Sequence, residues 1–365
     1  MTEIILSICI PTFQRKNELK RTIDALLPLI EKNSEIEICV SDNGSSDGTY
    51  ELLKNYANKY PKNFRIRRNK KNLGYDINYY KVAKMAKGKY IWVIGDDDLP
   101  QTKNIFDMIN KIKKADYGLV IANGGDIKSI ENLKKDFKKE EYLQDQFIRL
   151  YKDYLKRRNS GEVLNGFMSC FLYKKAFIKG ILKNKKYFGW IHYALFLKIL
   201  TDKKIGKILV YRNPLIIVPI QDGTKIFFPY QLDEVFIENK LKALREIKIK
   251  DYQRIDEIIQ NHKKQMYFKI LVASIIGKDF FEKKINEKNE KVIKNIEKIL
   301  GKSNEISSKF LLIFGKFFFE LNKITFLRKL IIFIASIHPK IRKYRKLSEL
   351  YFHKKIEDEK TRTKY

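Results

Sequence analysis

Three adjacent carboxylates, Asp96 to Asp98, follow the apolar run Ile91–Ile94 after a single glycine, Gly95. Four consecutive apolar residues are typical of a strand that is buried on both faces, as in a parallel sheet. The carboxylates would then lie just beyond the carboxyl end of that strand, where open α/β sheets bind their ligands. Adjacent carboxylates repel one another, and a hard divalent cation that also binds substrate phosphates would relieve the repulsion. The pattern therefore indicates chemistry on a phosphorylated substrate.

A second polar loop follows the apolar segment 35–40 and contains Asp42, Asn43, Gly44 and Asp47. A carboxylate in such a loop can accept a hydrogen bond from a nucleobase N–H or a ribose hydroxyl. Gly44 permits a tight turn, and Asp47 can cap the helix that follows. An ordinary strand–turn–helix connection is the alternative interpretation.

Asn72, Gly74 and Asn78 lie at the expected start of another helix. Polar side chains and a glycine at a helix start suit contact with a phosphate or a sugar. A plain helix cap would explain these residues without any ligand.

The first 125 residues alternate between strand and helix patterns. We expect strands at 4–10, 35–40, 64–68, 89–94 and 117–122, and helices at 17–30, 50–60, 76–86 and 100–113. Pro100 is expected in the first turn of the last helix. This alternation predicts an α/β fold with a mostly parallel sheet flanked by helices.

The rest of the chain changes character twice. Residues 126–160 are highly charged and are expected to form a loop and one surface helix, after which strands at 167–173 and 209–218 and a helix at 190–200 are expected. Beyond about residue 225 the pattern is helical, with few turn signals. We therefore expect one domain over 1–224 and a helical, basic region over 225–365.

The composition limits the compartment and the partners. The net charge of +32 implies an anionic partner, which could be a nucleic acid, a phosphorylated substrate or an anionic membrane surface, although the lysine-rich composition alone is an alternative explanation. The three cysteines lie in apolar runs without a CxxC pair, which indicates reduced core thiols in a cytoplasmic protein. The N-terminus reads as a first strand and not as a signal peptide, and no apolar stretch is long enough to span a membrane.

The motifs occur together in an order and spacing that is similar to a known family. The segments Ser7–Arg15 and Val40–Thr49, the pair Asn72 and Gly74, and the run from Gly88 to Asp98 resemble the family 2 glycosyltransferases. Members are nucleotide-sugar-dependent enzymes with the GT-A fold. The resemblance covers residues 1–125 closely, is loose to about 220 and is absent beyond.

This resemblance implies roles for individual donor-site residues. Pro11 and Thr12 would line the nucleotide pocket, and Asp42 would contact the base, typically uracil. Asp96 would face the ribose or sugar side of the D-x-D motif, and Asp98 would ligate Mg²⁺ or Mn²⁺, with Asp96 as the second candidate ligand.

Four further donor-side positions follow from the same comparison. Asn72 and Gly74 are assigned to donor binding, and Asp97 makes the register of the metal motif ambiguous because it could also be a ligand. Asn43 departs from the family, because many relatives carry a second aspartate there. The nucleotide preference is correspondingly less defined.

The family often places an acidic base on a helix in the second half of the domain. In the corresponding stretch here His192 takes that place, with an unperturbed pKa near 6.5 that suits a general base. Trp190 could stack on a sugar ring on the acceptor side. The alternative is that both residues simply pack a helix on the sheet, and Asp202 and Asp222 are rival bases.

The C-terminal region carries the strongest membrane signal. Residues 309–337 are apolar but interrupted by charges, and a basic cluster follows: Lys340, Arg342, Lys343, Arg345 and Lys346. This pattern favours binding in the plane of an anionic membrane. A packed helical subdomain or a homo-oligomer interface is the alternative. Nucleic-acid binding is disfavoured, because long apolar runs separate the basic residues and no recognition motif is present.

Together these features predict a metal-dependent inverting glycosyltransferase that transfers a hexosyl or N-acetylhexosaminyl group, with a UDP-sugar as the expected donor. A glycan or lipid-linked glycan of a bacterial surface polysaccharide, lipooligosaccharide or capsule is the expected acceptor. The expected location is the inner face of the cytoplasmic membrane, bound peripherally. Residues 1–125 would bind the nucleotide sugar and 126–224 the acceptor.

Two alternatives remain at the level of sequence. A nucleotidyltransferase could use the same acids, but the segment Pro11–Lys16 lacks the glycine expected of its phosphate loop. A non-catalytic, membrane-anchored binding protein is the second alternative.

Overall fold

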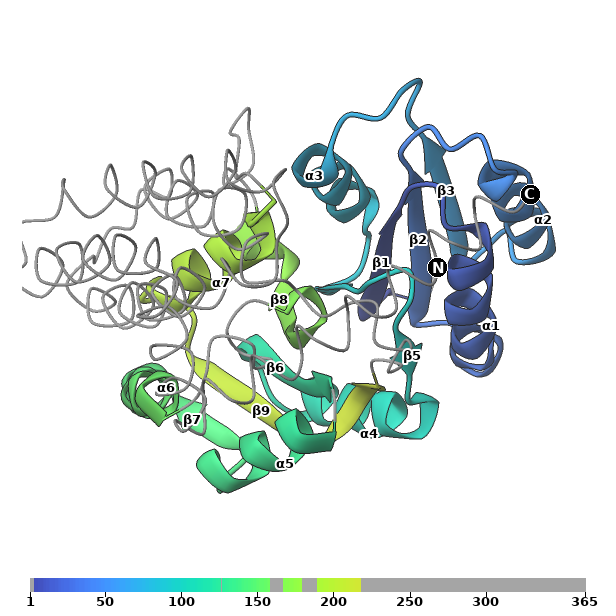
Figure 1. The fold of residues 1–365 in the computed structure, drawn as a ribbon. Coiled ribbons are helices and arrows are strands. Elements are labelled where there is room, and N and C mark those ends of the chain that lie inside the picture. The colour runs from blue at the N-terminus through green and yellow to red at the C-terminus, as the bar shows by residue number, and fades with distance from the viewer. Residues whose placement is uncertain (1–2, 126, 158–166, 179–188, 218–365) are drawn as a thin grey trace, which may run out of the picture. The chain divides into compact units, whose positions relative to one another are not determined.

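The computed structural model describes residues 3–125, 127–157, 167–178 and 189–217, all of which belong to one compact unit (Figure 1). Within these ranges no helix has the length and apolar character needed to cross a membrane. The predicted boundary at residue 224, Asp222 and the whole of 225–365 lie outside the described residues. The expectations about the C-terminal region therefore stay predictions.

The described residues alternate between strands and helices along most of their length. The strands are β1 (Leu6–Thr12), β2 (Ile36–Asp42), β3 (Phe64–Arg68), β4 (Tyr90–Val93), β5 (Leu99–Pro100), β6 (Tyr117–Gly125), β7 (Glu141–Leu143), β8 (Phe171–Lys174) and β9 (Lys207–Ile217). The helices are α1 (Lys16–Lys32), α2 (Thr49–Lys59), α3 (Tyr75–Met85), α4 (Thr102–Lys114), α5 (Ile127–Asp136), α6 (Gln144–Arg157) and α7 (Ile191–Leu200).

All nine strands join one sheet in the order β3-β2-β1-β4-β8-β6-β9-β5, with β7 also paired to β9. The four strands β3, β2, β1 and β4 are parallel, as are β6 and β9. Strand β8 runs antiparallel between β4 and β6. The predicted α/β fold with a mostly parallel central sheet is confirmed, and the antiparallel β8 joins its two parallel parts.

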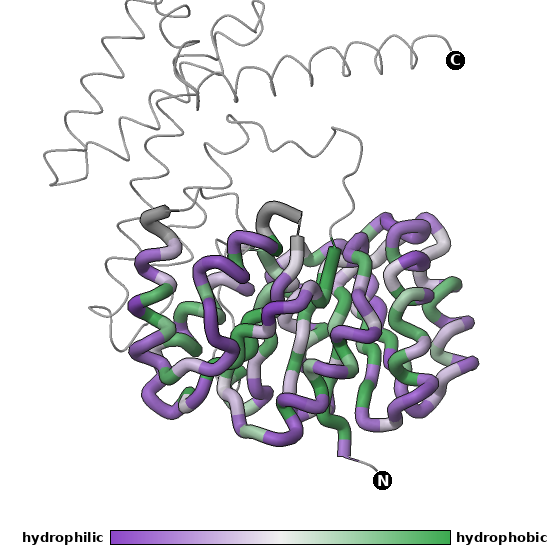
Figure 2. The backbone as a smooth tube through the Cα atoms, turned by 90° about the horizontal axis from the view of Figure 1, so that it is seen from below, coloured by the Kyte–Doolittle hydropathy of each residue, from purple (hydrophilic) through white to green (hydrophobic). Residues whose placement is uncertain are grey.

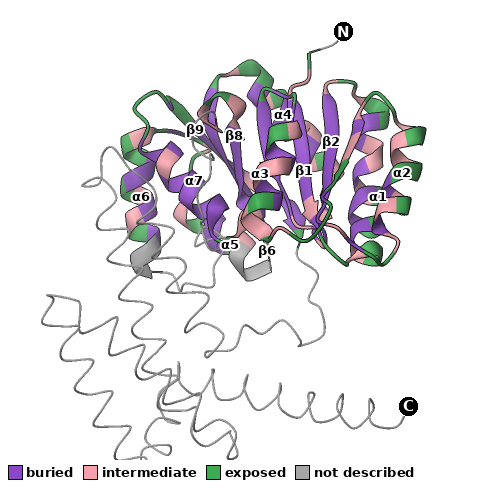
Figure 3. Cartoon of the chain, turned by 90° about the horizontal axis from the view of Figure 1, so that it is seen from above, coloured by how far each residue is buried: buried purple, intermediate pink, exposed green. Residues whose placement is uncertain are grey.

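Burial follows from the apolar content of the strands. All residues of β2 and all but Pro11 in β1 are buried, as expected for strands covered on both faces. Helices α1 and α2 lie on the opposite side of these strands from α3 (Figure 1). Hydrophilic residues gather on helices and loops (Figure 2), whose outer faces carry most of the exposed positions (Figure 3). The cysteines Cys9, Cys39 and Cys170 are buried, free thiols.

Three sequence-based expectations were wrong in detail. Pro100 does not open a helix: Leu99 and Pro100 pair with Ile217 and Ile216 of β9, and α4 begins at Thr102. Pairing with a strand more than a hundred residues away keeps the chain extended through the proline, and local helix signals cannot reveal such a pairing.

The charged segment 126–160 was expected to contain one surface helix, but it forms α5, β7 and α6. Its aromatic residues explain the difference. Phe137, Phe147, Tyr151 and Tyr154 are fully buried, and Phe147 stacks on Phe137 and Tyr151 at ring-centroid distances of 5.5 and 5.9 Å. The many charges therefore lie around a buried aromatic cluster. The start of the expected strand 167–173 is a short 3-10 turn, Met168–Cys170.

Gly88 allows close approach between the loop before β4 and β1. A Cβ at this position would lie 2.8 Å from the backbone nitrogen of Ser7 and 2.7 Å from its Oγ. We predict that Gly88→Ala lowers the free energy of unfolding by about 1–3 kcal/mol, because the backbone of β1 would have to shift. Urea denaturation measures the free energy of unfolding of both proteins. Lys87→Ala is the control, since that side chain is exposed, and equal stabilities of the two variants would contradict the prediction.

Candidate functional site

The two acidic loops meet at the carboxyl edge of the parallel strands. Thr12 and Asp42 are register partners at the ends of β1 and β2, and the neighbouring strand β4 leads to Asp96. The Thr12 hydroxyl donates a hydrogen bond of 2.8 Å to Asp96 Oδ2. Pro11 precedes Thr12 and is paired with Ser41. Residues from three separate segments are thus brought to one edge of the sheet, as the sequence predicted.

Arg15 binds two of the three adjacent carboxylates. Its Nε lies 2.9 Å from Asp96 Oδ1, and its Nη2 lies 2.7 Å from Asp97 Oδ2. Arg15 belongs to the first sequence motif, whose residue pattern alone indicates no role for it. Part of the repulsion within the acidic run is therefore relieved by a cation that the protein itself supplies.

Hydrogen bonds from two distant segments hold the backbone and the last carboxylate of the acidic loop. The Thr22 hydroxyl donates to the carbonyl oxygens of Asp96 and Asp98 at 2.9 and 2.8 Å. Asp98 Oδ2 accepts from the Gly95 N–H at 2.7 Å and from Ser169 Oγ at 2.5 Å. Asp98 is only 2% exposed, so its orientation is fixed by these contacts.

Asp96 has a perturbed acidity. Burial raises the pKa of this carboxyl to about 6, although the Arg15 guanidinium and the Thr12 hydroxyl act to lower it. Asp96 is therefore mostly ionised at neutral pH, but it is costly to ionise compared with an exposed aspartate.

The acidic loop fits a divalent cation that shares its ligands with substrate. Among the described residues no group of three or more His, Cys, Asp or Glu side chains is arranged to hold a metal. A cation held by one or two carboxylates does not need such a group, because phosphates and water complete its shell. Gly95 allows the close approach of these carboxylates, since a Cβ there would lie only 3.1 Å from both Asp97 Oδ1 and Asp98 Oδ2. Carboxylate oxygens are hard ligands, which suit Mg²⁺ or Mn²⁺.

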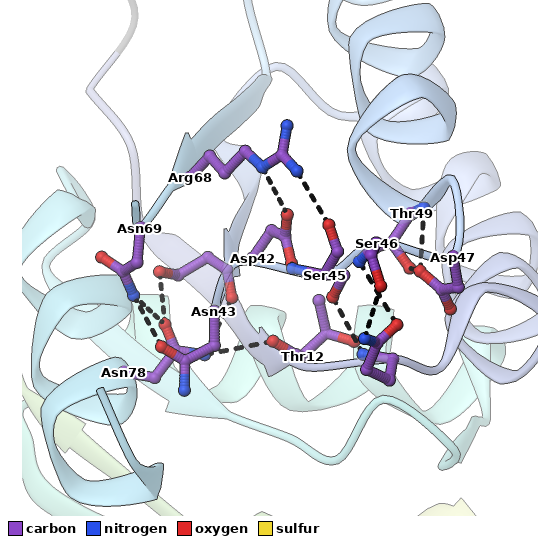
Figure 4. A network of polar contacts seen from close by, with 12 residues as sticks. Thr12, Asp42, Asn43, Ser45, Ser46, Asp47, Thr49, Arg68, Asn69 and Asn78 are labelled. Atoms are coloured by element: carbon purple, nitrogen blue, oxygen red, sulfur yellow. Dashed lines mark hydrogen bonds and ion pairs between the residues drawn. The ribbon is translucent and has the colours of Figure 1, made fainter. Parts of the chain in front are cut away.

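Asp42 is fully buried and holds its own loop (Figure 4). Its Oδ1 accepts a hydrogen bond of 2.9 Å from the Ser45 N–H. Its Oδ2 lies 3.4 Å from Arg68 Nε and has no hydrogen-bond partner within the described residues. Gly44 has a φ of +84°, a conformation that suits glycine and closes the turn. The second carboxylate oxygen of Asp42 therefore meets Arg68 as an ion pair and receives no hydrogen bond from the described residues.

Asn43 connects the loop after β2 to the loop before α3. Its Oδ1 accepts from Asn69 Nδ2 and from the Leu73 N–H, both at 3.0 Å. Its Nδ2 donates to Asn72 Oδ1 at 2.8 Å and to the Gly74 carbonyl at 3.3 Å. An aspartate could not make the last two bonds, because it has no N–H to donate. The departure from the family pattern is thus matched by the contacts of the amide.

The neighbouring polar groups extend this network. Asn78 Nδ2 donates to the Ser41 carbonyl at 2.9 Å, and Ser41 Oγ donates to Asn78 Oδ1 at 2.7 Å. Asp47 accepts from the Thr49 N–H at 3.1 Å, so it binds the first N–H of α2 from the position before the N-cap, which is Gly48. Its second oxygen accepts from the Lys16 N–H at 3.0 Å, which also joins the starts of α1 and α2.

His192 and Trp190 lie at the start of α7, each only 6% exposed, with ring centroids 5.7 Å apart. Tyr75 connects them to the donor side: its hydroxyl lies 3.2 Å from His192 Nδ1 and 2.8 Å from the Met168 sulfur. Met168 directly precedes Ser169, which contacts the acidic loop. The expected base is thus connected to the expected donor residues and is also well packed.

Asp202 follows the opposite end of α7. It is about 15 Å from His192 along the helix axis, and its Oδ1 accepts a hydrogen bond from the Lys204 N–H. The structure does not bring this rival base to the acidic loop. Asp222 lies outside the described residues.

Residues 7–182 match the family model described as Glycosyl transferase family 2. They form a family 2 glycosyltransferase domain. The match covers β2, β3 and β4, all but the first residue of β1, and both acidic loops, so the sequence-based identification of the family is confirmed.

Individual relatives share parts of this family 2 domain. Abequosyltransferase RfbV of Salmonella typhimurium is 42% identical over 97 residues, which are 26% of this chain and 28% of the relative. A GalNAc(5)-diNAcBac-PP-undecaprenol beta-1,3-glucosyltransferase of Campylobacter jejuni is 23% identical over 68% of this chain and 78% of its own length. The chain covers only 28–39% of the first three curated relatives that it matches.

Similarity of fold extends further than similarity of sequence. The mannosyltransferase PcManGT from Pyrobaculum calidifontis, solved with GDP-Man and Mn²⁺, superposes with a TM-score of 0.53 at 10% identity, over 96% of this chain and 86% of that one. At this identity the comparison supports the fold of the family 2 domain alone.

Asp96 should make the stability of the domain depend on pH. Because its folded-state pKa is about 6 and its unfolded value about 3.8, its contribution is fully present below pH 4 and is lost as pH rises to about 6. We predict that the free energy of unfolding of Asp96→Asn, relative to the unsubstituted protein, rises by on the order of 3 kcal/mol over this window.

Urea titrations at several pH values, with EDTA and without nucleotide, measure this difference. Asp116→Asn is a control of opposite sign, because a hydrogen bond from Lys174 lowers the pKa of Asp116. A difference between Asp96→Asn and the unsubstituted protein that does not change with pH would contradict the prediction.

Proposed function

We propose that the family 2 domain transfers a sugar from a nucleoside diphosphate donor to an acceptor hydroxyl, with inversion at the anomeric carbon. The observation that carries the proposal is the hydrogen bond between Thr12 and Asp96, because it joins the end of β1, where Thr12 is the register partner of Asp42, to the acidic loop at one sheet edge. A nucleobase and its diphosphate must be bound together, and these two loops supply suitable groups for each.

The proposed base contact is made by Asp42. Its Oδ2 is buried without a hydrogen-bond partner among the described residues, and a carboxylate accepts hydrogen bonds only. It would therefore favour a base with an N–H on the edge it meets, such as uracil or guanine. We propose uracil as the first candidate. Phe13 directly follows Thr12 and is 37% exposed, which makes it an additional candidate for stacking on the base.

The proposed diphosphate site is the acidic loop. Asp98, and Asp96 as second ligand, would hold Mg²⁺ or Mn²⁺ there, and a cation so held would stabilise the charge that develops on the leaving diphosphate. Arg15 holds Asp96 and Asp97 in place through its two ion pairs. Asn72 and Gly74, fixed by Asn43, are proposed to contact the ribose or the sugar.

The proposed acceptor side is the start of α7. His192 would take the proton of the attacking hydroxyl, and Tyr75 orients its ring through the contact at Nδ1. Trp190 lies beside it and is the proposed sugar-stacking residue. A base is needed because an alcohol has a pKa far above 7.

The acceptor class is proposed from the family together with the C-terminal sequence. The Campylobacter jejuni relative is named as acting on an undecaprenol-linked glycan. We propose a glycan or lipid-linked glycan of a bacterial surface polysaccharide as acceptor. Residues 225–365 would attach the protein peripherally to the inner face of the cytoplasmic membrane, with a homo-oligomer interface as the alternative use of this region.

Donor binding tests the Asp42 assignment. We predict that Asp42→Asn weakens UDP binding roughly tenfold, because the amide cannot accept at both positions. Binding of inorganic pyrophosphate should stay unchanged. Isothermal titration with Mn²⁺ present measures both ligands, and a panel of nucleotide sugars tested by thermal shift identifies the donor.

Asp116→Asn, an exposed substitution, is the control for that experiment. Equal loss of UDP and pyrophosphate affinity in Asp42→Asn would mean that the substitution disturbs the whole loop and does not remove a specific contact with the base. Absence of any nucleotide-sugar binding or turnover in the unsubstituted protein would refute the proposed function.

Metal removal tests the acidic loop. We predict that Asp98→Asn lowers transfer at least a hundredfold, since the amide keeps its size but loses the charge, and that EDTA abolishes transfer in the unsubstituted protein until Mn²⁺ or Mg²⁺ is restored. Product formation from the donor found in the panel is the measurement. Near-normal turnover in EDTA would refute the metal role.

A further inference from the structure

The N-terminus of α7 is capped by a residue from another helix. The N-cap position is occupied by Trp190, which makes no side-chain cap hydrogen bond. Asp76, in the first turn of α3, accepts hydrogen bonds from the Gly189 N–H at 3.0 Å and from the Ile191 N–H at 3.4 Å, one on each carboxylate oxygen. The Ile191 N–H is one of the backbone groups that a helix start leaves without a partner inside the helix, and the Gly189 N–H belongs to the residue before the N-cap. The negative charge also suits the positive end of the helix dipole.

The residue before Asp76 contacts the same helix. The Tyr75 hydroxyl lies 3.2 Å from His192 Nδ1, and the two rings pack edge to face at a centroid distance of 5.9 Å. Tyr75 and Asp76 therefore form a clasp. Asp76 binds the backbone at the start of α7, and Tyr75 contacts the side chain of His192.

The clasp follows the donor loop without a gap in sequence. Gly74 immediately precedes Tyr75, and its carbonyl accepts a hydrogen bond from Asn43. The same asparagine binds Asn72. The loop proposed to contact the donor and the helix proposed to contact the acceptor are thus joined through two consecutive residues.

Helix α7 does not depend on the clasp for its existence. Every residue of α7 except Lys198 is buried, so the helix is held by its packing. Loss of the Asp76 contacts would loosen the start of the helix, where Trp190 and His192 lie, and leave its remainder in place. This makes the role of Asp76 separable from the folding of the domain.

We infer that Asp76 is a positioning residue, which fixes Trp190 and His192 relative to the donor loop and is required for transfer to the acceptor but not for donor binding. This inference rests on the proposed function of those two residues. Asp76 itself touches neither substrate in this scheme.

Kinetics of three variants test the inference. Asp76→Ala should lower kcat for transfer at least tenfold while the Kd of the donor changes less than twofold. Asp76→Asn should be intermediate, because its carbonyl oxygen can still accept one of the two N–H bonds. Glu51→Ala is the control: it removes an acidic residue from the first turn of α2, which has no part in the clasp.

A fluorescence measurement tests the same point without activity. The chain has two tryptophans, the core residue Trp92 and Trp190, so Trp190→Phe provides the baseline of Trp92 alone. Acrylamide quenching of Trp190 should increase in Asp76→Ala and change less in Asp76→Asn. The control variant should behave as the unsubstituted protein.

The outcomes separate this inference from the proposed function. If the unsubstituted protein transfers sugar but Asp76→Ala has unchanged kcat and unchanged quenching, the inference is overturned. If the donor Kd rises as kcat falls in Asp76→Asn, Asp76 belongs to donor binding and the inference is also overturned. If the unsubstituted protein neither binds nor transfers, the proposed function fails, and quenching alone then decides whether the clasp holds α7. Should Asp76→Ala not fold, Asp76→Asn carries the comparison.

Discussion

The arrangement of the site depends on how three consecutive carboxylates are held at the end of a buried strand. Asp96 and Asp98 are almost inaccessible to water, so their charge must be compensated by groups of the protein or by a bound cation. Thr12, the last residue of β1, supplies a hydrogen bond to this run. Arg15, which follows shortly after, supplies two ion pairs. The end of β1 is therefore joined to the end of β4, and the strand order places β2 with Asp42 on the other side.

The remaining donor-side residues are organised by amides. Asn43 and Asn78 each use both halves of the side-chain amide, so that donors and acceptors of β2 and of the loop before α3 are satisfied by neutral groups. A buried amide network of this kind avoids further negative charge beside Asp42 and the acidic loop. It also fixes the loop before α3. The residues that follow this loop, Tyr75 and Asp76, contact the start of α7.

The sequence contained enough information for the parallel half of the sheet. The strand at 64–68 was predicted with its observed bounds, and the helices and strands around it agree within a few residues, because apolar periodicity within a window is a local property. The polar residues Thr12, Asp42 and Asp96 could also be assigned to one sheet edge, since carboxyl ends of parallel strands necessarily share an edge.

Other features were decided only by tertiary structure, because they depend on pairs that are distant in sequence. Pro100 is extended since it pairs with β9, Ser169 reaches Asp98 since β8 lies beside β4, and Asp76 caps α7 across more than a hundred residues. No local pattern identifies such partners: an aspartate in the first turn of a helix reads as a cap of its own helix. The sequence by itself determined which residue types gather at the strand ends, whereas the fold determined which ion-pair or hydrogen-bond partner each of them contacts.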